Sequence, residues 1–129
     1  MCPHAPITHD LHSVTAALQT LGMDAEDLPR VSGLIFNRFL ELLDIAEQQI
    51  RATDLEHARA TMHILRGCMV NTLFPEVYEE IEQLRGAVLC QAWQEAEQQL
   101  LQVRLVFAPI QAVMGHWLEQ KGVTSGRSP

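Results

Sequence analysis

A histidine, an arginine and a glycine stand close together near the middle of the chain. His63 is followed by Arg66 three residues on and by Gly67 four residues on, so on a helix all three lie along one side. An imidazole can act as a nucleophile, a guanidinium can neutralise an anion, and a glycine lets another molecule approach closely. These residue types predict a site at which a negatively charged group meets the histidine.

The surrounding pattern places His63 on the outside of its helix. At about 100° per residue, His63 lies roughly 125° from the middle of the apolar stripe, and Ala60 and Gly67 lie nearly opposite that stripe. We therefore expect an exposed imidazole between two residues with little or no side chain. The stripe itself repeats at spacings of three and four and consists of Leu55, Ala58, Met62, Leu65, Met69 and Leu73.

Four neighbours extend the face around the histidine. Arg59 and Arg66 flank it and favour an anion bound at the ring, while Ile64 and Val70 form a small apolar margin that a partner could cover. Because an exposed glycine inside a helix costs about 1 kcal/mol relative to alanine, close approach of another molecule is a reason for Gly67. The alternative is that a helical protein with six histidines exposes one of them by chance.

Helical periodicity covers the first part of the chain. Residues 1–9 are expected to be an irregular lead-in, and a short helix follows over about residues 10–21. A second helix begins at Pro29, where the missing N–H would be unpaired anyway, and runs to about Ala52. Its predicted buried stripe consists of Val31, Leu34, Ile35, Phe39, Leu42, Ala46 and Ile50.

Two more helices follow. Thr53 and Glu56 have the spacing of a capping box, in which a hydroxyl and a carboxylate satisfy free amides at a helix start. The third helix is predicted to begin there and to continue to Pro75. A fourth helix covers residues 76–85, with Gly86 interrupting the pattern.

The last helix is predicted to be the longest, with Val88 and Leu89 at the start of its inward face and Pro109 bending or breaking it. No stretch alternates like a strand, so the fold class is all-α. The simplest arrangement is an antiparallel four-helix bundle with an additional short N-terminal helix. Residues 10–120 would form a single domain, followed by a flexible C-terminal tail over residues 121–129.

The composition of the chain disfavours several classes of partner and several cellular locations. The net charge of -7 gives no electrostatic reason to bind nucleic acid or an anionic membrane. Three cysteines without paired spacing favour a reducing compartment, and no apolar run reaches membrane-spanning length, so we expect a cytoplasmic protein. Cys2, His4, His9 and His12 match no zinc-finger spacing, and no metal site is expected. One bundle accounts for every stripe, which favours a monomer.

Around His63 the sequence resembles the histidine-containing phosphotransfer (HPt) family. In that family the phospho-accepting histidine is followed by a hydrophobic residue two positions on, a lysine three on, a glycine four on, a small residue five on and often an asparagine eight on. The resemblance extends over about residues 31–120. At the offsets of the motif, this chain has Leu65, Arg66, Gly67, Cys68 and Asn71.

The chain departs from the family pattern at two positions. Arg66 keeps the charge of the usual lysine but replaces a point donor with a planar fork. Leu73 stands where the family has a glycine, and Phe74 and Pro75 follow it. We therefore expect the end of this helix to differ, with an effect on the choice of partner.

The resemblance implies a role in a two-component phosphorelay. His63 would accept a phosphoryl group from the receiver domain of a hybrid sensor kinase and pass it to a response regulator, with Arg66 neutralising its charge. The receiver would supply Mg²⁺, and the domain itself would need no cofactor. Since there is no glycine-rich nucleotide loop, no autonomous kinase activity is expected. Contact with the receiver is assigned to Arg59, Ala60, Ile64, Gly67, Val70 and Asn71.

Two other interpretations stay open. The first is an HPt-like binding module that docks a receiver domain or another regulator without carrying phosphate. The second is a helical adaptor in which the motif arises by chance.

Overall fold

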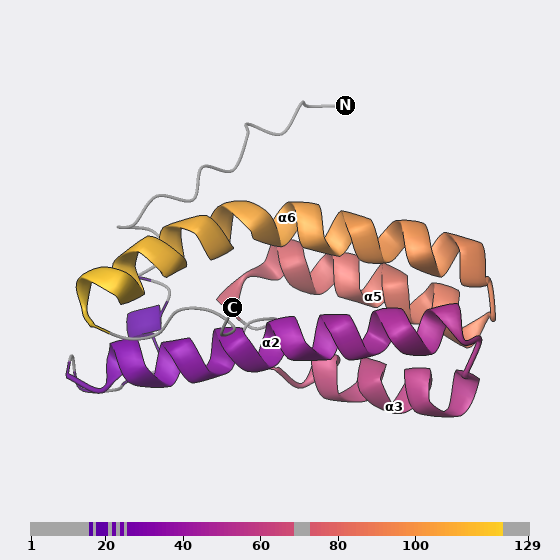
Figure 1. Ribbon diagram of the computed structural model, residues 1–129, viewed down its shortest axis with the longest axis horizontal. Helices are drawn as coiled ribbons and strands as arrows, with labels where there is room; N and C mark the ends of the chain where they lie inside the picture. The colour runs from indigo at the N-terminus through magenta and orange to yellow at the C-terminus, as the bar shows by residue number, and fades with distance from the viewer. Residues whose placement is uncertain are drawn as a thin grey trace.

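The computed structural model describes residues 16, 18–20, 22, 24, 26–68 and 73–122. This part of the chain is helical and contains no strand, which confirms the predicted all-α class. Its helices lie side by side (Figure 1), and α2 and α5 each pack against both α3 and α6. Most of the expected helix over residues 10–21 lies outside the described residues. The helices are α2 (Leu28–Arg51), α3 (Leu55–Arg66), α5 (Pro75–Leu89) and α6 (Trp93–Gln120).

An aromatic cluster occupies the core between α2 and α6. The ring of Phe107 on α6 lies 5.5 Å from that of Phe36 and 4.7 Å from that of Phe39, measured between centroids. Phe74, directly before α5, meets Phe36 edge-on at 6.2 Å. All four rings are buried. The cluster therefore joins three helices through contacts that aromatic pairs favour.

The predicted buried stripes agree well with α3 and only in part with α2. Ala58, Met62 and Leu65 of α3 are fully buried, as expected. On α2, however, Leu34 is 61% exposed, against the prediction. Because α2 packs against two helices, its buried face is wider than one stripe and is rotated away from Leu34. The buried residues of α2 that the prediction missed include Phe36, Leu40 and Leu43.

Polar side chains also join the packed helices. Between α3 and α2, Thr61 Oγ1 donates a hydrogen bond of 2.6 Å to Gln49 Oε1. Between α6 and α2, Arg104 Nη2 lies 3.0 Å from Asp44 Oδ1 and 3.2 Å from Glu47 Oε1. Such contacts add directional restraints to the apolar packing and help to fix how each helix is aligned with its neighbour.

The N-terminus of α3 is capped by a different residue from the one predicted. Asp54 Oδ1 accepts the backbone N–H of His57 at 3.2 Å, and Asp54 Oδ2 lies 2.7 Å from His57 Nδ1. Thr53 has a left-handed φ of 51° and lies in the turn before the cap. The expected capping box of Thr53 and Glu56 is therefore wrong, and Asp54 is the N-cap residue.

This cap predicts an acid-sensitive contribution to stability. Hydrogen bonding from His57, chiefly its backbone N–H, lowers the pKa of Asp54 below its ordinary value. The cap therefore stabilises the fold above the ordinary aspartate pKa of about 3.9, and this contribution is lost as pH falls through the lowered value. Asp54→Asn keeps a capping oxygen but does not titrate, so its free energy of unfolding should decline less below about pH 4. Urea unfolding at a series of pH values measures this, and parallel curves would contradict it.

Helix ends differ from the prediction at two glycines. α3 ends at Arg66 rather than continuing to Pro75, and Gly67 is its C-cap. The expectation that Gly67 lies inside a helix is therefore wrong, and the cost of about 1 kcal/mol for an interior glycine does not apply to it. α5 continues through Gly86 to Leu89, because one interior glycine costs only about 1 kcal/mol and buried apolar residues lie on both sides of it.

The last helix is continuous. α6 passes through Pro109, and Figure 1 shows it as one bent helix, so the expected bend is found without a break. Within the described part of the chain, no helix is both long enough and apolar enough to cross a membrane.

Candidate functional site

His63 lies on the outer face of α3, as the helical pattern predicted, and is exposed together with Ala60 and Gly67. Because α3 ends at Arg66, His63 belongs to the last turn of the helix and not to its middle. The imidazole is thus accessible to a second protein. Val70 and Asn71, also predicted to contact a partner, lie outside the described residues.

The space around Gly67 shows no internal need for a glycine. Its φ of -84° is in the ordinary right-handed region. A Cβ atom there would lie 3.7 Å from the backbone oxygen of Ile64 and 3.8 Å from that of His63, which are normal contacts. Neither the backbone nor the packing of the described residues therefore explains the glycine, which leaves room on the surface beside the histidine.

An open hollow of about 650 Å³ lies between α3 and α5, and His63 lines it. Two of the lining residues are apolar and well exposed, Ile64 at 48% and Leu89 at 39%. The hollow combines an imidazole, two guanidinium groups, one carboxylate and an apolar margin. Its lining residues are Glu56, Arg59, Ala60, His63 and Ile64 from α3, and Arg85 and Leu89 from α5.

Arg66 is directed towards α5. Its Nε lies 3.1 Å from Glu82 Oε1 and 3.5 Å from the hydroxyl of Tyr78. The hydrogen bond with Tyr78, and after it the charge of Glu82, raises the pKa of Arg66 above its ordinary value. This contact ties α3 to α5. The role of Arg66 in neutralising a phosphoryl group stays a prediction.

Sequence reasoning missed Arg85 and Leu89 as site residues. It ended the fourth helix at Arg85 and assigned Leu89 to the inward face of the next helix, whereas Leu89 is exposed on α5. Since α5 continues through Gly86, the two residues are four apart on one helix face. The spacing that could have revealed this runs across the glycine, through Val77, Ile81, Leu84 and Val88.

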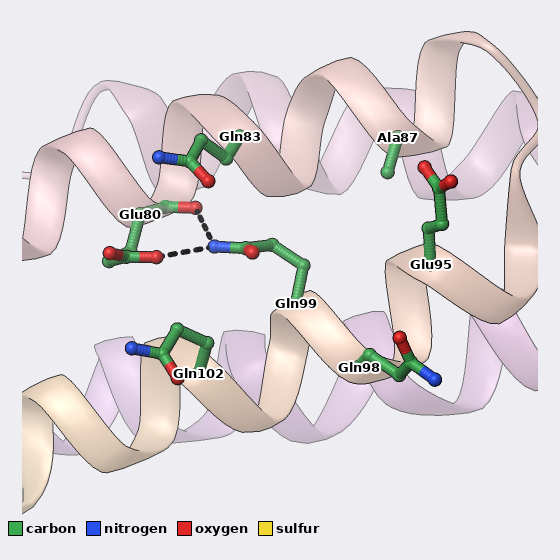
Figure 2. A pocket seen from close by; sticks show the side chains of 7 residues that line it. All are labelled: Glu80, Gln83, Ala87, Glu95, Gln98, Gln99 and Gln102. Carbon is green, nitrogen blue, oxygen red and sulfur yellow. Dashed lines mark hydrogen bonds between the residues drawn. The ribbon is translucent and has the colours of Figure 1, made fainter.

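A second hollow, of about 570 Å³, lies between α5 and α6 (Figure 2). The amide of Gln99 donates hydrogen bonds to Glu80 Oε2 at 2.6 Å and to the backbone oxygen of Glu80 at 3.0 Å. Figure 2 shows that Gln99 reaches across the hollow to make them. This contact joins α5 to α6, and the hollow is lined by carboxylates, amides and one alanine, with no histidine, cysteine or arginine among them. The other lining residues are Gln83, Ala87, Glu95, Gln98 and Gln102.

Metal binding was not expected from the sequence. Among the residues that the structure describes, no group of histidine, cysteine, aspartate and glutamate is arranged to hold a metal ion. Cys2, His4, His9 and His12 lie outside the described residues.

Comparisons with known proteins give no family for this chain. No family model matches it, and neither a curated protein nor a solved structure matches it. Its function therefore has to be inferred from the chemistry of the site.

Proposed function

We propose that the chain is a histidine phosphotransfer protein of a multistep phosphorelay. His63 accepts a phosphoryl group from an aspartate in the receiver domain of a hybrid sensor kinase and passes it to the receiver domain of a response regulator. The observation that supports this most is the exposed imidazole of His63 in a hollow that also contains Arg59 and Arg85. The likeness of the sequence around His63 to the HPt motif supports it further.

The proposed fold is an antiparallel four-helix bundle with a short additional helix at the N-terminus. The connections of three residues from Ala52 to Asp54 and from Cys90 to Ala92 support it, because short connections favour antiparallel neighbours. We propose that this bundle acts as a cytoplasmic monomer and binds neither nucleic acid nor a membrane.

The transfer step needs little from the chain besides the imidazole. An unprotonated ring nitrogen of His63 attacks the phosphorus of the aspartyl phosphate. The P–N bond forms as the P–O bond breaks, and the aspartate leaves as a carboxylate with the bonding electron pair. A neutral imidazole already carries the lone pair, so no general base is required. Mg²⁺ comes with the receiver, and transfer to the second aspartate reverses the step.

The receiver covers the hollow in this proposal. Ile64 and Leu89 provide exposed apolar contacts, and Ala60 and Gly67 leave space for a close approach. Apolar side chains next to polar and charged groups are a common composition of a protein interface.

A second candidate is an HPt-like module that binds a receiver without carrying phosphate. One observation favours it, the contact of Arg66 with Glu82 and Tyr78, because the guanidinium predicted to meet the phosphoryl group already has partners.

Incubation with a radiolabelled phospho-receiver and Mg²⁺ tests transfer. We expect acid-labile, base-stable label on the wild type and none on His63→Gln. His57→Gln is the matched control, since His57 is exposed on the same helix but does not line the hollow, and it should keep the label. Stable binding of a receiver without label would favour the binding module. Absence of both binding and label would leave the helical adaptor and refute the proposal.

A further inference from the structure

We infer that Arg59 and Arg85, rather than Arg66, supply the positive charge that neutralises the phosphoryl group on His63. This inference rests on the proposed function and identifies two charge-neutralising residues for it. Both guanidinium groups come from residues that line the same hollow as the imidazole, one on each of two helices. A phosphoryl group on the ring would extend into this hollow and meet positive charge from α3 and from α5.

Arg59 lies one turn before His63 on α3. Residues four apart on a helix are neighbours, with Cβ atoms about 5–6 Å apart, so the long arginine side chain can reach a group on the ring. Arg59 is exposed, and it forms no ion pair with any residue in the described part of the chain. Glu56 also lines the hollow, but it does not form an ion pair with Arg59. The charge of Arg59 is therefore available to an incoming anion.

Arg85 remains available to an incoming anion because its neighbour Glu82 is paired mainly with Arg66. Both arginines lie near Glu82, but Arg66 Nε is 3.1 Å from Glu82 Oε1, whereas Arg85 Nη1 is 4.0 Å from Glu82 Oε2. The closer partner of this carboxylate is thus Arg66. Arg85 keeps only a weak contact with Glu82. It also lines the hollow, where its positive charge is only partly compensated by that carboxylate.

The two guanidinium groups act where negative charge is greatest. A transferring phosphoryl group spreads its charge over the oxygens, and fixed cations beside them stabilise the transition state. Interactions between exposed charges are modest and fall with salt, since the Debye length shrinks from about 8 Å at 0.15 M to about 3 Å at 1 M. The contribution of Arg59 and Arg85 should therefore be largest at low ionic strength.

Phosphoramidate separates this role from the docking of a receiver, because it is a small donor that phosphorylates imidazole directly. The test compares the wild type with the double variant Arg59→Ala/Arg85→Ala and with Arg30→Ala/Arg38→Ala. The control pair removes the same charge from exposed positions on α2. We expect labelling of His63 to be about tenfold slower in the first variant and less than about twofold slower in the second. In about 1 M salt the tenfold difference should shrink to about twofold or less.

Three results would overturn the inference. Equal labelling rates in the two double variants, with label on the wild type, would show that Arg59 and Arg85 do not neutralise the phosphoryl group. The proposed function would remain intact. If His63 were labelled more slowly in Arg66→Ala than in Arg59→Ala/Arg85→Ala, and Arg66→Ala kept a native circular dichroism spectrum, Arg66 would be the residue that neutralises the phosphoryl group. A wild type that takes label from neither phosphoramidate nor a receiver would refute the inference and the proposed function together.

Discussion

Replacement of Phe107 by alanine should lower the free energy of unfolding by about 3–5 kcal/mol. The ring is 1% exposed and contacts Phe36 and Phe39, so the substitution removes buried apolar area and two aromatic pairs. Both partner rings belong to α2, and α2 also packs against α3, so it cannot move into the cavity without disturbing that second contact. The loss is a large share of the about 5–15 kcal/mol that stabilises a typical domain.

Urea unfolding followed by far-UV circular dichroism measures this loss. Leu105→Ala is the matched control, because Leu105 is on the same helix but is 67% exposed, and it should change the free energy by no more than about 0.5 kcal/mol. Similar losses in both variants would mean that Phe107 is not the centre of a packed cluster.

The second large effect concerns Gly67. We expect Gly67→Leu to slow transfer from a phospho-receiver by about a hundredfold while the fold is retained. A Cβ atom fits at this position, but the rest of a leucine side chain would project into the space that the receiver approaches. Steric overlap of a well-packed contact costs about 1–3 kcal/mol, and each 1.4 kcal/mol is a factor of ten.

Initial transfer rates and thermal unfolding curves measure these two outcomes separately. Gly67→Ala is the control, because its single added carbon makes only normal contacts, and its rate should stay within about threefold of the wild type. Labelling by phosphoramidate should fall much less than transfer from the receiver, since the small donor needs no docking. A loss of helicity in Gly67→Leu would instead make Gly67 a structural residue.

The existence of the helices could be predicted from the sequence, but their ends could not. Periodicity over long segments identifies a buried face, and Pro29 marks the start of α2. At the start of α3, two adjacent residues, Thr53 and Asp54, can both cap a helix, and local sequence does not choose between them. At Gly86 the packing of α5 against α3 and α6 outweighs the small local cost of a glycine.

Some residues of the candidate site could likewise be predicted from the sequence, and others could not. The exposure of His63 follows from the spacing of apolar residues along one helix, and it was predicted. Arg85 and Leu89 could not be assigned to the site, because packing sets how α5 is rotated relative to α3. The direction of Arg66 likewise depends on Tyr78 and Glu82, two residues of another helix that the spacing around His63 does not reveal.

The early end of α3 bears on how long a phosphoryl group would stay on the protein. His63 is in the last turn, and the carbonyl groups that end a helix carry a partial negative charge. A phosphoryl group bound there would be repelled by this charge, at an energy of about 0.3–1 kcal/mol, or roughly two- to fivefold in equilibrium. In a relay this would make the phosphorylated histidine a stronger donor. It would also keep the fraction of phosphorylated protein low, so that the phosphoryl group is passed on rather than stored.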